Sequence, residues 1–141
     1  MRAQVIPVVP ERSLDFDNIP GTQEVVLADM VDVLHWRELT LLVRVHQHSL
    51  SSGAGTIRIT AQPQSWSGED PGVTFVDTSA LLPFLVVIDS NTPSPGYLSK
   101  GIQMFGVPAM TAMTRIVAKA ERVAAGAMTA TVSVDLAAKH I

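Results

Sequence analysis

Apolar and polar residues alternate along the first half of the chain. Residues 38–49 place Leu41 and Val43 among apolar positions that recur at every second residue, and residues 56–62 repeat the pattern. Period two is the side-chain repeat of a β-strand, whose alternate residues face the core and the solvent. Because residues 51–55 form a Ser/Gly-rich turn, we predict that the two strands pair as a β-hairpin.

The same alternation returns near the C-terminus. Residues 127–137 interleave apolar side chains with Thr129, Thr131 and Ser133, and residues 112–123 precede them across a turn at 124–126. This predicts a second long hairpin with a Thr/Ser outer face. Alanine favours helix, so 114–128 also has a helical interpretation, but the β-branched residues and the period of two favour strands.

The remaining segments complete an all-β pattern. Short strands are predicted at 73–76 and 81–88, loops at 63–72 and 89–96, and a mixed segment at 24–34 that is a strand followed by a bulge, a second strand or a helical turn. Short strands separated by turns, without an amphipathic helix, predict an antiparallel two-sheet sandwich. Jelly-roll and immunoglobulin-like topologies both fit this pattern.

The N-terminal segment is predicted to be an extended arm covering residues 1–22, followed by a single sandwich domain over 23–141. Its apolar residues are interrupted by prolines, which confines them to a sheet edge, either their own or a neighbour's. We assign Val5, Ile6, Val8 and Val9 to an interface with neighbouring copies. Removing residues 1–20 is therefore expected to weaken association and leave the fold intact.

Composition adds reasons to expect association. Apolar residues make up 47% of the chain and charged residues 16%, with mean hydropathy +0.28, which is high for a monomer that must cover its surface with polar groups. There is no cysteine, so disulfide frameworks and thiolate chemistry are absent. No apolar run reaches the roughly 18 residues of a membrane span or resembles a signal peptide, so we expect a cytoplasmic protein without membrane contact.

Charge is low but uneven along the sequence. The net charge of −3, with scattered lysines and arginines, argues against direct nucleic-acid binding. Seven acidic residues occur from Glu11 to Glu38. After Tyr97 the sequence contains five basic residues and only two acidic ones, Glu121 and Asp135. This asymmetry suits head-to-tail contacts between copies, although ordinary solvated charges explain it equally well.

His46 and His48 are the best candidates for chemistry. A His-x-His pair on a regular strand places both imidazoles on one face, as in some metal sites. A third ligand would have to be His35, His140 or a carboxylate, none at an informative spacing, so we predict no metal. The simpler interpretation is a solvated or interface face of the strand.

Other candidate motifs are weaker. Trp66 could stack on a sugar, but few aromatic residues accompany it, and Glu69 and Asp70 are adjacent in a turn rather than opposed across a substrate. No serine-hydrolase elbow, phosphate-binding loop or dinucleotide motif is present. We therefore predict no catalytic residues and no cofactor. A methionine-rich group fits core and interface equally: Met104, Met110, Met113 and Met128, with Phe105, Val107 and Pro108.

The strand at 36–45, the Gly-rich turn, the strand at 56–62 and the closing strands to Leu136 resemble small β-sandwich proteins of tailed-phage and prophage-derived particles. The resemblance spans roughly residues 24–138 as a strand pattern and transfers no functional residue. It implies a non-enzymatic structural or decoration protein of a virion, assembled in the cytoplasm with copies of itself and other structural proteins. The alternatives are a carbohydrate-binding or adhesion module that uses Trp66 and loop 89–96, and a cupin-like enzyme that uses His46 and His48.

Overall fold

The computed structural model describes residues 2–17, 22–32, 38–65, 74–75, 85–103 and 113–140. These residues form nine strands: β1 (Arg2–Asp15), β2 (Thr22–Asp32), β3 (Glu38–Leu50), β4 (Gly55–Ser65), β5 (Thr74–Phe75), β6 (Leu85–Ile88), β7 (Gly96–Gln103), β8 (Met113–Arg122) and β9 (Met128–His140). Over the same ranges, no helix has the length and apolar character needed to cross a membrane. The predicted all-β class is confirmed.

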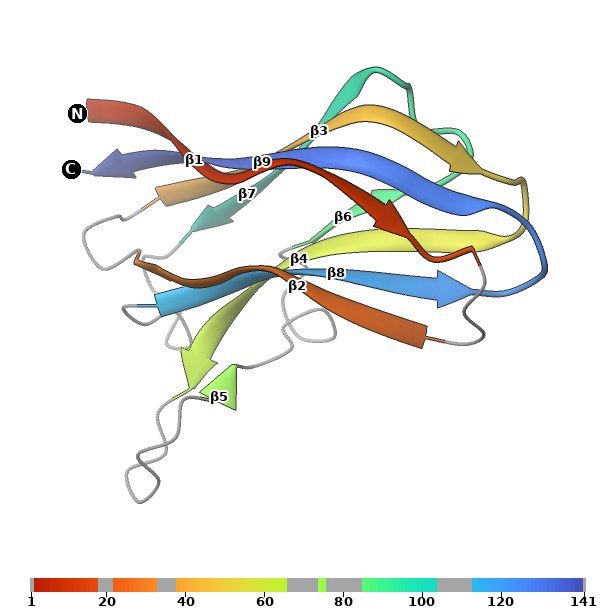
Figure 1. Cartoon of the computed structure of the whole chain (residues 1–141). Coiled ribbons are helices and arrows are strands. Elements are labelled where there is room, and N and C mark those ends of the chain that lie inside the picture. The colour runs from red at the N-terminus through yellow and green to blue at the C-terminus, as the bar shows by residue number, and fades with distance from the viewer. Residues whose placement is uncertain are drawn as a thin grey trace.

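The strands build two antiparallel sheets that face each other as a sandwich (Figure 1). One sheet has the order β1-β9-β3-β7, and the other has β2-β8-β4 with β6 beside β4 and the short β5 at the far end of β4. With β5 left aside, every connection except β4 to β6 passes from one sheet to the other. This is the strand order of a jelly roll, which decides between the two predicted topologies.

The core lies between the sheets and follows the predicted alternation. Inward positions of β3, β4, β8 and β9 are almost completely buried, while their neighbours face outward. The largest fully buried side chains include Leu41, Val43, Val45, Ile57, Ile59, Ile88, Ile116, Met128 and Leu136. Met128, which the sequence left open between core and interface, therefore belongs to the core.

Both predicted hairpins are wrong in one respect. Strands β3 and β4 lie in different sheets, and so do β8 and β9, so each connection arches across the sandwich instead of joining neighbours in one sheet. The two arches pack on each other: Ser51 N–H donates to the Ala127 carbonyl at 3.0 Å, and Val123 N–H donates to the Ala54 carbonyl at 2.8 Å. Each apolar face is therefore buried against the opposite sheet.

The N-terminal segment is extended and lies along the edge of its own sheet. Strand β1 pairs with β9 from Arg2 opposite His140 to Asp15 opposite Thr129, so the two chain ends lie side by side (Figure 1). Leu14 and Phe16, within the predicted arm, are core residues. We therefore expect that removal of residues 1–20 destroys the fold, and not that it leaves the fold intact.

Candidate functional site

The four predicted interface residues divide between surface and core. Val9 is 2% exposed and opposite Val134, so its assignment to an interface is corrected: its side chain is enclosed by its own core. Ile6 and Val8 are half-buried against that core, whereas Val5 is 58% exposed. The cause is the pairing of β1 with β9, which turns alternate side chains inward. Val5 alone of the four presents a largely open side chain.

Arg122 fixes the end of β1 to the arch between β8 and β9. Its guanidinium donates to four main-chain carbonyls: Phe16 and Asp17 at 2.7 Å each, Gly126 at 2.8 Å and Ala124 at 3.2 Å. The Asp17 carboxylate in turn accepts the Met128 N–H. A guanidinium with its five N–H groups suits such a cluster of carbonyls, so Arg122 holds the end of β1 against the β8–β9 arch.

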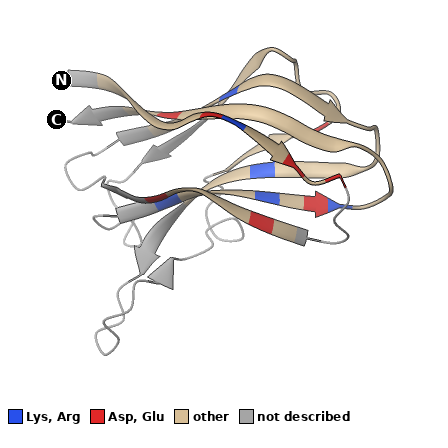
Figure 2. Cartoon of the chain, viewed as in Figure 1, with Lys and Arg blue, Asp and Glu red and all other residues tan. Residues whose placement is uncertain are grey.

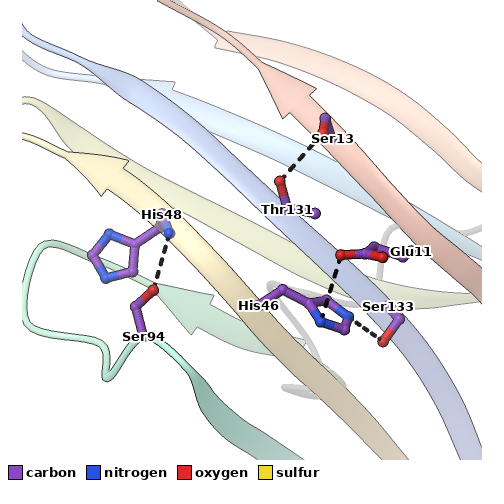
Figure 3. A network of polar contacts seen from close by, with 7 residues as sticks. All are labelled: Glu11, Ser13, His46, His48, Ser94, Thr131 and Ser133. Atoms are coloured by element: carbon purple, nitrogen blue, oxygen red, sulfur yellow. Dashed lines mark hydrogen bonds and ion pairs between the residues drawn. The ribbon is translucent and has the colours of Figure 1, made fainter.

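His46 and His48 do not share a face, because β3 contains a bulge between them. Val45 lies opposite Val132 and Gln47 opposite Thr131, which leaves His46 without a partner in the ladder. An extra residue reverses the alternation of all that follow. The predicted His-x-His geometry is therefore wrong: His46 projects on the outer face and His48 turns toward the β6–β7 loop (Figure 3).

His48 is held by that loop. Its Nε2 lies 2.6 Å from the Thr92 carbonyl, which can only accept, so Nε2 carries the proton. Its main-chain N–H donates to Ser94 Oγ at 3.2 Å, while Nδ1 is buried without a partner. With one ring nitrogen engaged and the other enclosed, His48 serves loop packing rather than ligation. Within the described ranges there is no group of three His, Asp or Glu residues placed to hold a metal ion.

His46 joins three strands of the outer face. Its Nε2 lies 3.0 Å from Ser133 Oγ on β9, and its Nδ1 lies 3.7 Å from Glu11 Oε1 on β1 (Figure 3). The order of contacts resembles a serine, histidine and carboxylate triad. However, the N–H groups of a strand paired on both sides point toward its neighbours, not out of the face, so they cannot stabilise an oxyanion above Ser133.

A hollow of about 410 Å³ lies over β1, β9 and β3, and its lining is mostly polar, with Ser13, Asp15, Gln47, His48 and Ser49 among its residues. Besides the His48 imidazole, this lining contains no Trp, Tyr or Phe ring for stacking on a sugar. Outside the described residues lie His35, Trp66, Glu69, Asp70, Met104, Phe105, Val107, Pro108 and Met110, and of His140 and Met113 only the backbone is described. The sugar-binding hypothesis for Trp66 stays a prediction.

Exposed apolar side chains gather at the rims of the sandwich. Of the described large apolar residues with substantial exposure, Val5 lies on β1, Val26 on β2, Val87 on β6 and Tyr97 on β7. These four strands lie at edges of the two sheets, as the two-residue β5 also does, and the fifth such residue, Val123, lies in the β8–β9 arch. The described parts of the central strands β3, β4, β8 and β9 carry none.

The two rims differ in charge. At the rim formed by β1 and β2, here the acidic rim, the described charged side chains comprise one arginine, Arg12, and five carboxylates: Glu11, Asp15, Asp17, Glu24 and Asp29 (Figure 2). At the opposite rim, formed by β6 and β7, the exposed ring of Tyr97 on β7 has its centroid 5.6 Å from the guanidinium of Arg44, which lies on the neighbouring strand β3. The sequence pattern gives no sign of this pair, because the contact depends on β7 lying beside β3.

Comparison with known proteins gives little further information. No protein-family model matches the chain, and no curated protein matches it. Among solved structures, the chain is similar to one from T=1 particles derived from infectious bursal virus, with 14% identity and a TM-score of 0.26. The match covers 97% of this chain and 40% of that chain, so the present chain spans less than half of the other's length. At this TM-score the likeness carries no argument about function.

Proposed function

We propose that this protein is a non-enzymatic structural subunit that assembles with copies of itself, as a capsid or decoration component of a virion or virus-like particle formed in the cytoplasm. The observation that carries the proposal is the placement of exposed apolar side chains on β1, β2, β6 and β7, which lie at the edges of the two sheets. A subunit with apolar side chains on its edge strands is suited to packing edge to edge in a shell.

The jelly roll by itself does not select this function. Viral capsid subunits, lectins and cupins all use the fold, so the residues must decide between them. The cupin hypothesis needs His46 and His48 on one face, and the bulge separates them. The lectin hypothesis needs a platform of Trp, Tyr or Phe, and the lining of the described hollow over β1, β9 and β3 contains none of these residues. Assembly is the hypothesis that the described surface supports best.

The absence of catalysis is part of the proposal. The Glu11, His46 and Ser133 contacts tie three strands together, and Ser133 lacks main-chain donors directed at the outer face. We expect a fluorophosphonate probe to leave Ser133 unlabelled, with Ser133→Ala as the matched control in mass spectrometry. Labelling of Ser133 that disappears in His46→Ala would contradict the non-enzymatic proposal.

Light scattering after size exclusion, together with negative-stain microscopy, tests the assembly proposal. We expect a defined oligomer or particle whose mass exceeds the 15.1 kDa of one chain. A Val26→Ser and Val87→Ser double variant should shift assembly to higher concentration, because it removes apolar area from two rims. Thr131→Ala, on the polar face of β9, is the control. A wild-type chain that stays monomeric up to millimolar concentration would overturn the proposal.

A further inference from the structure

The two rims of the sandwich offer opposite hydrogen-bonding chemistry. The exposed groups of the acidic rim include the carboxylates of Glu11, Asp15 and Asp29, which accept hydrogen bonds and carry negative charge. The Glu11 side chain is 64% exposed, and its Oε1 lies 3.7 Å from His46 Nδ1. This surface therefore favours a partner that supplies donors and positive charge.

The opposite rim supplies such groups. Arg44 and Tyr97 are both exposed and form one cation–π pair, and Tyr97 is 75% exposed, so the guanidinium and the phenol can both donate to an incoming carboxylate. Asp89, in the loop between β6 and β7, directs its Oδ1 to Asn91 N–H at 2.9 Å and to the Thr92 hydroxyl at 3.4 Å. Its carboxylate is thus engaged within its own loop.

We propose that the acidic rim of one copy docks on the Arg44–Tyr97 pair of the next copy, so that the chain associates head to tail. The inference rests on the self-assembly proposed above and names the surfaces that meet. A two-fold contact of acidic rim with acidic rim would oppose carboxylates, and one of Arg44–Tyr97 with itself would oppose guanidinium groups. The heterologous pairing avoids both repulsions.

The composition of the contact fits what carries binding energy at protein interfaces. Tyrosine and arginine are enriched at interface hot spots, where a few central residues supply most of the affinity. Val87 on β6 and Val26 on β2 place apolar area on the two rims that would meet. A head-to-tail contact repeats from copy to copy and produces a ring, a shell or a filament, according to the rotation between neighbours.

Complementary charge reversals test the inference. Arg44→Glu reverses the charge of the Arg44–Tyr97 surface. Glu11→Lys with Asp29→Lys reverses two charges of the acidic rim and also removes the contact of Glu11 with His46. Each variant alone should lose assembly beyond the monomer. An equimolar mixture should recover assembly with alternating variants, because the intact acidic rim of the first meets the intact Arg44–Tyr97 surface of the second and the two reversed surfaces also carry opposite charges. Mass photometry and light scattering measure the masses, and circular dichroism confirms that each variant is folded.

Two further variants sharpen the test. Lys119→Glu makes the same charge change as Arg44→Glu, but on β8 opposite Glu24 of the acidic rim, where added negative charge should not weaken docking on Arg44–Tyr97. Tyr97→Ala should raise the concentration for half-assembly about 30-fold, the effect of losing a hot-spot side chain. Unchanged assembly of Arg44→Glu, or a mixture that does not recover assembly, overturns the head-to-tail inference and leaves self-assembly standing. A monomeric wild type overturns both.

Discussion

Replacement of Arg122 by alanine is the most direct test of how the N-terminal strand is held. The change removes the donors to four carbonyls, on Phe16, Asp17, Ala124 and Gly126. A hydrogen bond from a charged donor contributes about 1.5–3 kcal/mol, and bonds made by one group are not additive. Because Arg122 is half-buried, water can reach some of the released carbonyls. We expect the free energy of unfolding to fall by about 3 kcal/mol, the equivalent of one to two such bonds.

Urea denaturation followed by circular dichroism measures this loss. With an m-value of about 2 kcal/mol/M, the unfolding midpoint should fall by about 1.5 M. Arg122→Lys keeps the charge but has one ammonium group in place of the planar fork, and should lose about half as much. Arg58→Ala is the matched control: its ion pair with Glu121 at 3.2 Å is over one-third exposed on both sides and contributes less than about 1 kcal/mol. A loss below about 1 kcal/mol for Arg122→Ala would refute the anchoring role.

Three other predictions follow from the packing. Deletion of residues 1–20 removes three buried core side chains, worth about 6 kcal/mol of burial, so the truncated chain should show no cooperative thermal transition; a sharp transition would contradict the placement of β1. Gly126 has φ +152°, and an added Cβ would lie 2.8–2.9 Å from side-chain carbons of the facing arch, so Gly126→Ala should lower the melting temperature by about 5–10 °C, more than Gly53→Ala, which meets open space. A zinc site shared by the two histidines would disappear in His46→Ala and also in His48→Ala. Titration with zinc in a calorimeter should detect no such site, because a shared site needs the two rings on one face.

Most strands could be predicted from the sequence because each packs one face on the core and turns the other face to solvent, which produces alternating apolar and polar residues. The expected strand at 38–49 is β3 (Glu38–Leu50), and the strand at 56–62 lies within β4 (Gly55–Ser65). The mixed segment at 24–34 contains most of β2 (Thr22–Asp32), whose pairing with β8 shifts register twice, which confirms the bulge among its alternatives. Turn residues indicate that the chain reverses, but they do not tell whether the next strand joins the same sheet. The sequence therefore predicts hairpins at 51–54 and 123–127, where the structure has arches between the sheets.

The bulge at His46 is visible in the spacing of apolar residues along β3. Val45 and Leu50 are both core residues of β3, yet five positions separate them, whereas two inward residues of a regular strand differ by an even number. Val9 and Leu14 show the same odd separation in β1, where the pairing with β9 also shifts. Parity between apolar positions therefore locates a bulge. It does not reveal which rim side chains stay exposed, since that depends on the order of strands in each sheet.

The edge of β1 also limits how copies can meet. Pro7 and Pro10 have no N–H to offer an added strand, and two register shifts bend β1 away from regular pairing. On the opposite rim β7 is regular, in register with β3 over eight consecutive pairs. A head-to-tail contact joins these unlike edges, so a continuous intermolecular sheet is disfavoured and side chains must carry the contact. Because charged side chains are part of it, association should weaken as salt screens the acidic rim, whereas backbone pairing between strands would be far less sensitive to salt.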